Sequence, residues 1–242
     1  MIVKDILVKP GTIEDTQLAT KARSIFQKKK KKYLIATKKK APTGVISLKS
    51  IIRLKDKKSN LQCKSFSDPI SVVLADDLPI IEAAKLMETS SSDVGIILYK
   101  GKLKGTIDHE ALLSGFLKAG YSPVKKTIAE LNPANLSAKL EATPAGVLRK
   151  LQKSPGVAVL KKKEVIGVIS RSDFLSHSEF RNGGKHLDEV TTSPAFTVNS
   201  STKVEAAAGQ MIKRNFSILP VVDGKNFIGT VTSADLVSAY VG

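Results

Sequence analysis

Two short stretches of the sequence place a hydroxyl residue three positions before an aspartate. In one, Ser170 precedes Asp173, and in the other, Thr232 precedes Asp235. An ionised carboxylate can accept two strong, charge-assisted hydrogen bonds, and a hydroxyl at the start of a helix favours phosphate. The same spacing also caps helices, which contributes about 0.5–2 kcal/mol without any ligand. Because these two roles are compatible, ligand binding and helix capping both stay open.

The chain offers little material for catalysis. No nucleophile lies beside a base in a recognisable motif, and no glycine-rich phosphate loop of the Walker type is present. The three histidines are eight or more residues apart, so no metal site is expected. Cys63 is the only cysteine, which excludes an intrachain disulfide and a cysteine-based metal cluster. We therefore expect a binding protein and not an enzyme.

Both hydroxyl–aspartate stretches belong to a fourfold repeat. "GVISRSDFL" begins at Gly167 and "GTVTSADLV" at Gly229, and both match "GVISLKSII" at Gly44 and "GTIDHEALL" at Gly105. Successive glycines are 61, 62 and 62 residues apart. Such a regular period determines the architecture, so the elements that position the aspartates must be interpreted copy by copy.

Each copy has the pattern of strand, helix, strand, strand and helix. The first helix of each copy is amphipathic. Phe26, Met87 and Met211 occupy the same position in this helix, where we expect them in the core. The corresponding helix of the third copy, "TPAGVLRKLQKS", aligns less well. One copy of about 60 residues buries little surface alone, so the copies are expected to pair. Apolar, β-branched runs then begin ten residues before each glycine and predict hairpins, at 34–37, 95–98, 157–160 and 219–222.

The formal net charge of +17 favours anionic partners such as nucleotides, nucleic acid or acidic proteins. Lysine outnumbers arginine 33 to 6, and there is no tryptophan, which weakens the case for nucleic acid. We interpret the lysines of the predicted hairpins as a solvated edge, with a polyanion-binding surface as the alternative. These lysines are Lys38 to Lys40, Lys100, Lys102, Lys104 and Lys161 to Lys163, and Lys28 to Lys32 form a further run before a strand.

Nothing in the sequence indicates a membrane protein. No run of 18 apolar residues is present, and charged residues interrupt the apolar stretch at the N-terminus, which argues against a signal peptide. An intracellular, cytoplasmic protein is the expectation.

The order of elements, with "LPVVD" followed by "GTVTSADLV", resembles the CBS domain, a regulatory module named after cystathionine β-synthase. The resemblance covers nearly the whole chain as four tandem copies, which we place at residues 1–54, 62–118, 122–178 and 185–242. It implies an α/β (α+β) fold of four β-α-β-β-α motifs, packed as two pseudo-symmetric pairs.

The resemblance also implies a ligand site. In the family, the hydroxyl of the motif contacts phosphate and the aspartate accepts hydrogen bonds from a ribose diol. Copies three and four keep both groups, whereas copies one and two have Ser50 and Ala111 in place of the aspartate. Copy two also has Asp108 at the hydroxyl position, where its charge would repel phosphate. The residues expected to bind the ligand are Ser170, Ser172, Asp173, Ser217, Pro220, Thr230, Thr232 and Asp235.

From this resemblance we expect a stand-alone regulatory sensor. An adenosine-containing ligand, namely AMP, ADP, ATP or S-adenosylmethionine, would occupy the cleft of copies three and four, as in energy sensing. The output would pass to an unknown protein partner, and homodimerisation through the pairs stays open. The alternative is a nucleic-acid-binding or scaffolding protein that uses its lysine-rich hairpins.

Overall fold

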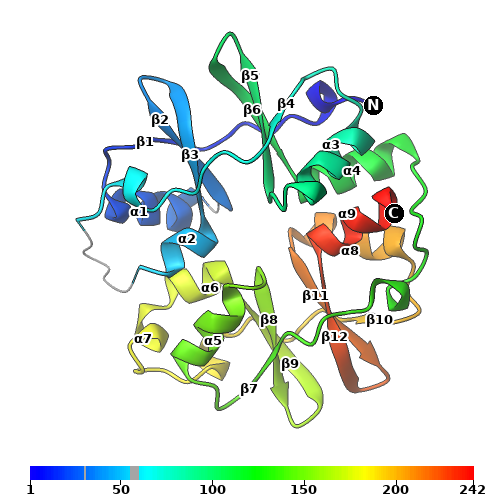
Figure 1. The fold of residues 1–242 in the computed structure, drawn as a ribbon. Helices are drawn as coiled ribbons and strands as arrows, with labels where there is room; N and C mark the ends of the chain where they lie inside the picture. Colours follow the sequence, from blue (N-terminus) through cyan, green and yellow to red (C-terminus); the bar gives the residue numbers. More distant parts are fainter. Residues whose placement is uncertain (30, 55–59) are drawn as a thin grey trace.

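The computed structural model describes residues 1–29, 31–54 and 60–242. It contains four three-stranded sheets, one for each repeat copy, with helices packed against them (Figure 1). The predicted α/β class and the predicted order of elements are both confirmed.

The helices and strands recur in the same order in every copy. Copy one contains β1 (Thr12–Glu14), α1 (Ala19–Lys29), β2 (Tyr33–Lys38), β3 (Ala41–Ser47) and α2 (Leu48–Ile52). Copy two contains β4 (Val73–Leu74), α3 (Ile80–Thr89), β5 (Val94–Tyr99), β6 (Lys102–Asp108) and α4 (His109–Ala119). Copy three contains β7 (Ser137–Lys139), α5 (Pro144–Leu151), β8 (Gly156–Lys161), β9 (Glu164–Ser170), α6 (Arg171–Ser176) and α7 (Ser178–Arg181). Copy four contains β10 (Val198–Asn199), α8 (Val204–Arg214), β11 (Ile218–Asp223), β12 (Asn226–Thr232) and α9 (Ser233–Val241).

Within each sheet, the first strand runs parallel to the second, and the second pairs antiparallel with the third. The first helix supplies the crossover that a parallel pair requires. The four hairpins lie where the sequence predicts them. Exposed lysines occur in the predicted turns of copies one to three, and Lys225 lies in the turn of copy four. Lys39, Lys100 and Lys162 adopt the positive φ of a tight turn there. Of the run from Lys28 to Lys32, residue 30 lies outside the described part of the chain.

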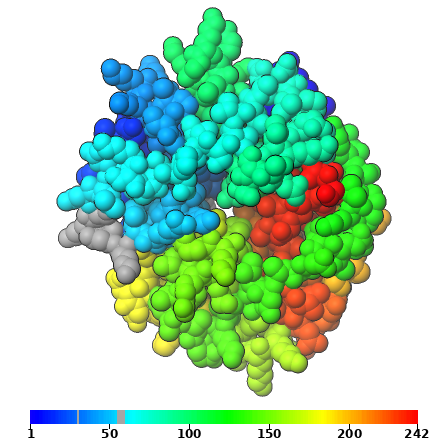
Figure 2. Space-filling view, in the orientation of Figure 1, coloured from blue at the N-terminus to red at the C-terminus, as the bar shows by residue number. Residues whose placement is uncertain are grey.

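The four copies form two pairs, as predicted. Copies one and two meet through β3 and β6, and copies three and four meet through β9 and β12. Helices then join the pairs, because α6 packs against α2 and α9 packs against α3. The two hairpins of copies one and two project from one edge of the molecule, and those of copies three and four project from the opposite edge (Figure 1). A small hollow remains where the four copies meet (Figure 2).

Each of the two hydrophobic cores belongs to both pairs. One core combines the apolar faces of copies one and three, and the other combines those of copies two and four. Phe26, Met87 and Met211 are buried in these cores, which confirms their predicted role. Since a single copy cannot enclose its own helices, neither pair buries its apolar surface without the other.

A segment at the start of each copy crosses to the neighbouring copy. Four short 3₁₀ helices mark these segments. Three of them contribute a buried side chain to the core of the neighbour, and the third in chain order packs the half-buried Leu131 against it. They are η1 (Val3–Ile6), η2 (Cys63–Ser65), η3 (Ala129–Leu131) and η4 (Asp188–Val190). After each 3₁₀ helix the chain pairs with the third strand of the neighbour, through the bridges Val8 with Thr106, Asp68 with Val45, Ala134 with Thr230 and Thr192 with Val168. We name these the crossing segments.

The crossing segments explain the repeated glycine in copies one, three and four. A Cβ atom at Gly229 would lie 2.5 Å from the carbonyl oxygen of Pro133, and one at Gly167 would lie 2.8 Å from that of Thr192. A Cβ atom at Gly44 would lie 2.9 Å from the carbonyl oxygen of Asp68. Backbone this close leaves no room for a side chain, so the repeated glycine is a requirement of chain packing.

Among the described residues, no helix has both the length and the apolar character needed to cross a membrane.

Candidate functional site

The predicted pair in copy three forms a complete capping box at the start of α6. The backbone N–H and the hydroxyl of Ser170 donate to Oδ2 of Asp173 at 2.8 and 2.7 Å, and the Asp173 N–H donates to the Ser170 hydroxyl at 3.2 Å. Both bonds that the Asp173 carboxylate accepts use Oδ2. Within the described chain, Oδ1 accepts no hydrogen bond.

Copy four repeats this geometry at the start of α9. The backbone N–H and the hydroxyl of Thr232 donate to Oδ2 of Asp235 at 2.7 and 2.8 Å, and the Asp235 N–H donates back at 3.2 Å. Asp235 is exposed and Asp173 is half-buried. Both aspartates therefore cap a helix and still present a second carboxylate oxygen.

The other predicted residues have three kinds of environment. Ser172 is exposed on the first turn of α6. Pro220 and Thr230 are paired in the ladder between β11 and β12, and both are buried. The Thr230 hydroxyl donates to the carbonyl of Ala134 at 3.1 Å, so it holds the crossing segment. Ser217 lies just before β11 and donates to Glu110 of copy two at 2.8 Å.

The structure does not gather the eight predicted residues around one cavity. The two capping boxes begin helices that pack against different copies, α6 against copy one and α9 against copy two. None of the eight lines either of the two cavities described below.

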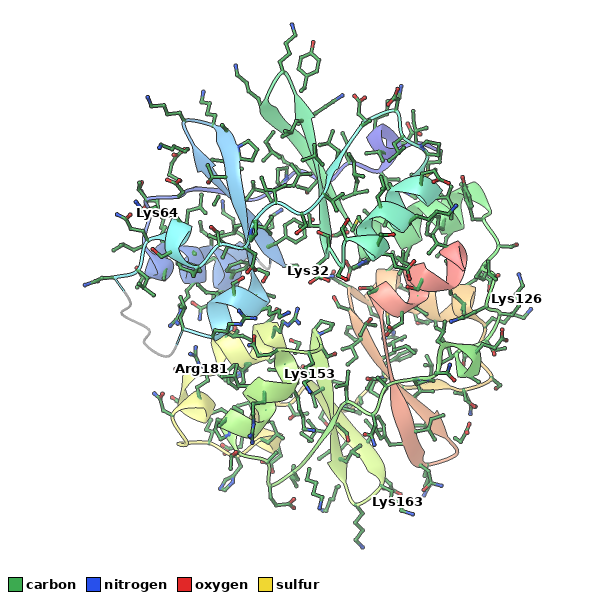
Figure 3. All side chains as sticks on the ribbon, in the orientation of Figure 1. Lys32, Lys64, Lys126, Lys153, Lys163 and Arg181 are labelled. Atoms are coloured by element: carbon green, nitrogen blue, oxygen red, sulfur yellow. The ribbon has the colours of Figure 1, made fainter. Side chains whose placement is uncertain are left out.

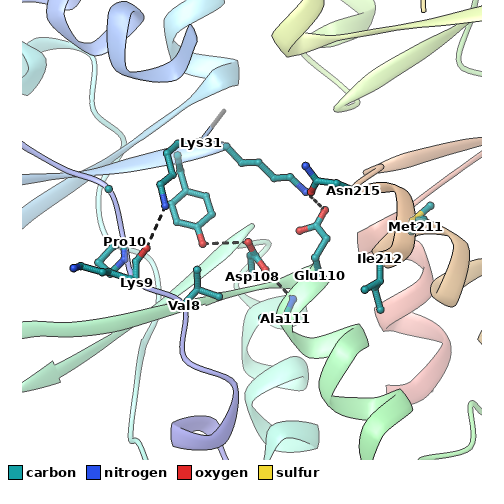
Figure 4. A pocket seen from close by; sticks show the side chains of 13 residues that line it. Val8, Lys9, Pro10, Lys31, Asp108, Glu110, Ala111, Met211, Ile212 and Asn215 are labelled. Carbon is teal, nitrogen blue, oxygen red and sulfur yellow. Dashed lines mark hydrogen bonds and ion pairs between the residues drawn. The ribbon is translucent and has the colours of Figure 1, made fainter. Parts of the chain in front are cut away.

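The larger cavity, about 340 Å³, lies between copies one, two and four (Figure 4). We call it the central cavity. Its walls come from the first crossing segment, the start of β2, the start of α4 and the end of α8. The lining residues are Val8, Lys9, Pro10, Gly11, Lys31, Lys32, Tyr33, Asp108, Glu110, Ala111, Met211, Ile212 and Asn215.

A polar network of three copies lines this cavity. Lys32 of copy one forms an ion pair with Glu110 of copy two at 2.6 Å, and Ser217 of copy four donates to the same carboxylate. Burial alone would raise the pKa of Glu110, but the ion pair with Lys32 and the hydrogen bonds from Lys32 and Ser217 outweigh it. The pKa of Glu110 is consequently below its ordinary value, and this carboxylate is ionised.

Asp108 titrates in the opposite direction. It caps α4 by accepting from the Ala111 N–H at 2.8 Å, and the Tyr33 hydroxyl donates to its other oxygen at 3.2 Å. Burial, followed by the charge of Glu110, raises the pKa of Asp108. Burial, followed by the charge of Asp108, raises the pKa of Tyr33 as well. Two neighbouring carboxyl groups line this cavity together with Lys9, Lys31 and Lys32, and the expected repulsion of phosphate at Asp108 stays a prediction.

Sequence analysis missed the network of Lys32, Tyr33 and Glu110. The repeat register contained a signal for the first of these, because Lys32 precedes β2 at the position where Ser217 precedes β11. The contact between Ser217 and Glu110 had no signal, since it joins copies two and four across the interface of the pairs.

Copy one recovers a carboxylate that its own motif lacks. Ser47 and Ser50 form the capping box of α2, and the Ser50 hydroxyl donates to Oδ2 of Asp68 at 2.8 Å. Asp68 belongs to the crossing segment from copy two. The departure from the motif at Ser50 is thus partly compensated by a residue distant in sequence.

No group of three or more histidine, cysteine, aspartate or glutamate side chains suited to a metal ion occurs in the described part of the chain. The arrangement offers carboxylates, hydroxyls and the half-buried ion pair of Lys32 with Glu110.

Comparison with known proteins agrees with this architecture. Residues 187–242 match the family model for the CBS domain. A protein of Methanocaldococcus jannaschii, described as a candidate archaeal homologue of g-AMPK, matches with a TM-score of 0.84 at 17% identity, over 98% of this chain and 99% of that chain. An uncharacterised conserved protein of Pyrococcus horikoshii matches with a TM-score of 0.70 at 20% identity, over 100% of both chains.

At these identities, the two long matches establish the fold. The family model establishes copy four directly, and the four sheets repeat its arrangement of strands and helices. Residues 187–242 therefore match the CBS domain, and the other three copies repeat the fold of this segment, arranged with it as two pairs.

Proposed function

We propose that this chain is a regulatory sensor that binds an adenosine-containing ligand with Asp173 and Asp235. AMP, ADP, ATP and S-adenosylmethionine are the ligands considered, and energy sensing in the cytoplasm is the process that they suggest. One observation carries the proposal. In copies three and four, Oδ2 of the aspartate holds the helix cap, while Oδ1 accepts no hydrogen bond from any described residue. A ribose diol can use that oxygen without breaking the cap.

The charge around copy three supports an anionic ligand. Arg171 directly follows Ser170, and its Nε donates to the carbonyl of Leu151 at 2.8 Å. Burial lowers the pKa of Arg171, and the nearby charge of Arg53 lowers it further, while Asp93 acts in the opposite direction. Two arginines near one partly buried position favour an anion such as a phosphate group.

The position of the two boxes supports a regulatory role. Each box begins a helix at the interface of the pairs, since α6 packs against α2 and α9 packs against α3. A ligand that contacts the start of either helix with different affinity in two packing states would shift the equilibrium between them. The signal would then pass to a protein partner.

The test is thermal unfolding of the full chain with AMP, ATP and S-adenosylmethionine. A bound ligand stabilises the folded state by RT ln(1 + [L]/Kd), about 2.7 kcal/mol at a hundredfold excess over Kd. The response should disappear in the double variant Asp173→Ala/Asp235→Ala. It should persist in Asp77→Ala/Asp223→Ala, which removes two exposed carboxylates elsewhere. The proposal is wrong if no adenosine ligand changes the melting temperature, or if the first double variant responds like wild type.

A second candidate function is binding of nucleic acid by the hairpins. Exposed lysines lie in all four turns, and Tyr99, which is 61% exposed, has the Lys100 amine 5.5 Å from its ring centroid. An exposed aromatic ring beside lysines can stack on a base. This function predicts an affinity for single-stranded nucleic acid that falls steeply with salt and does not depend on Asp173 or Asp235. Gel-shift titrations at two salt concentrations measure both properties.

A further inference from the structure

The smaller cavity, about 210 Å³, lies where α1 of copy one meets α6 and α7 of copy three. We call it the side cavity. It shares no lining residue with the central cavity and none with the eight residues predicted to bind the adenosine ligand. Apart from Leu175, every lining residue is polar, and none is acidic: Thr20, Arg23, Ser24, Gln27, Leu175, Ser176, Ser178 and Arg181.

Two guanidinium groups converge on one oxygen atom at this cavity. Nη2 of Arg23 donates to the carbonyl of Leu54 at 2.6 Å, and Nη2 of Arg181 donates to the same oxygen at 2.8 Å. Arg23 is 6% exposed, and Arg181 lies between α7 and the end of α2 (Figure 3). The shared carbonyl oxygen therefore holds the two guanidinium groups side by side at the wall of the side cavity.

Arg181 has no acidic partner within the described residues. Its guanidinium lies over the ring of Phe174, with 5.5 Å from its central carbon to the ring centroid. Burial lowers the pKa of Arg181, with no contribution from a carboxylate. The fork of N–H donors in a guanidinium matches the oxygens of a phosphate or sulfate.

Four hydroxyl groups complete the lining. Thr20 and Ser24 lie one turn apart on α1, and Ser176 and Ser178 flank the junction of α6 and α7. None of these hydroxyls makes a side-chain hydrogen bond within the described part of the chain. A tetrahedral oxyanion offers several acceptors and would satisfy hydroxyls and guanidinium groups together.

We propose that the side cavity is a binding site for a phosphate group, supplied as inorganic phosphate or as a phosphate monoester, that links copy one to copy three. The guanidinium groups of Arg23 and Arg181 bind the charge, and the hydroxyls of α1, α6 and α7 orient the oxygens. Because the site joins the two pairs, its occupancy stabilises their interface.

The experiment is a calorimetric titration of the full chain with inorganic phosphate and, separately, with glycerol 3-phosphate, at constant ionic strength. Saturable binding is expected in at least one arm, and the arm that binds identifies the source of the phosphate group. Arg181→Gln should weaken the affinity at least tenfold. Arg149→Gln, which removes an exposed arginine on α5, should leave it unchanged.

Asp173→Ala/Asp235→Ala should bind the phosphate probe like wild type, which keeps this proposal independent of the proposed adenosine ligand. Absence of saturable binding in both arms would overturn the inference. Equal affinity in wild type and Arg181→Gln would overturn it as well.

A second variant covers the case in which Arg181→Gln does not fold. Ser176→Asp places a carboxylate in the side cavity, at the C-terminal end of α6, where a negative charge gains nothing from the helix dipole. The variant should melt at a higher temperature than wild type without phosphate, and phosphate should no longer raise its melting temperature. A lower melting temperature together with an intact phosphate response contradicts the proposal.

Discussion

The repeated glycine offers a sharp test of how the copies are joined. In copy four, Gly229 lies under the crossing segment, and a Cβ atom there would meet the carbonyl oxygen, carbonyl carbon and Cβ of Pro133 at 2.5, 2.8 and 2.6 Å. Contacts under 3 Å with backbone cannot be relieved by rotating a side chain. Gly229→Ala must therefore push the crossing segment away from β12.

The cost follows from the bonds that hold this segment. Ala134 and Thr230 exchange two backbone hydrogen bonds of 3.1 and 2.9 Å, and the Thr230 hydroxyl adds a third at 3.1 Å. At about 0.5–1.5 kcal/mol each, their loss costs about 2–4 kcal/mol, similar to the strain that follows from overpacking. We expect Gly229→Ala to lower the free energy of unfolding by that amount.

Gly209 provides the matched control. It lies in α8, where a Cβ atom would meet nothing within 4 Å. Gly209→Ala should stabilise the chain by about 0.5–1 kcal/mol, because alanine loses less conformational entropy in a helix. Urea denaturation of both variants measures the difference. A Gly229→Ala variant within about 0.5 kcal/mol of wild type would refute the packing explanation, since that is the usual range of an innocuous substitution.

Three further predictions concern buried titratable groups. Asp108→Asn keeps the cap of α4 and should stabilise the chain more at pH 7 than at pH 4. The raised pKa of Asp108 contributes stability below the unfolded value of 3.8, and this contribution is lost as pH rises through the folded pKa. Chemical denaturation of wild type and variant at both pH values checks this, and an equal effect of the substitution at both contradicts it. Glu110→Gln should destabilise the folded chain by about 1–3 kcal/mol at pH 7 and by less near pH 4. The lowered pKa of Glu110 contributes stability above the unfolded value of 4.5, and this contribution is lost as pH falls through the folded pKa. An equal loss of stability at both pH values would contradict the ion pair with Lys32. Burial, followed by the charge of Asp15, raises the pKa of Cys63 to about 11. A thiol reagent at pH 8 should therefore label Cys63 only after the chain unfolds. Rapid labelling of the native chain would contradict this prediction.

The hairpins and helices were predictable because their signals are local. Apolar runs before each glycine predicted β2, β5, β8 and β11, and three- and four-residue spacing predicted the buried positions of Phe26, Met87 and Met211. The pairing of copies followed from the size of one unit, which is too small to enclose its own core.

The helix caps were also predictable, since a capping box needs only residues three positions apart. The structure realises the boxes at Ser170 and Thr232. Their role in ligand binding stays a prediction, because a cap and a ligand use different oxygens of the same carboxylate.

By itself, the sequence determined the repeat, the order of elements and the positions of the two intact hydroxyl–aspartate pairs. All of these depend on residues that are neighbours along one copy. The tertiary structure alone decided what meets between copies. It brought Lys32, Glu110 and Ser217 together from three copies, set Asp68 beside Ser50, and directed Arg23 and Arg181 to one carbonyl oxygen. These contacts depend on how the crossing segments and helix faces pack, and packing across an interface leaves no periodic trace in the chain.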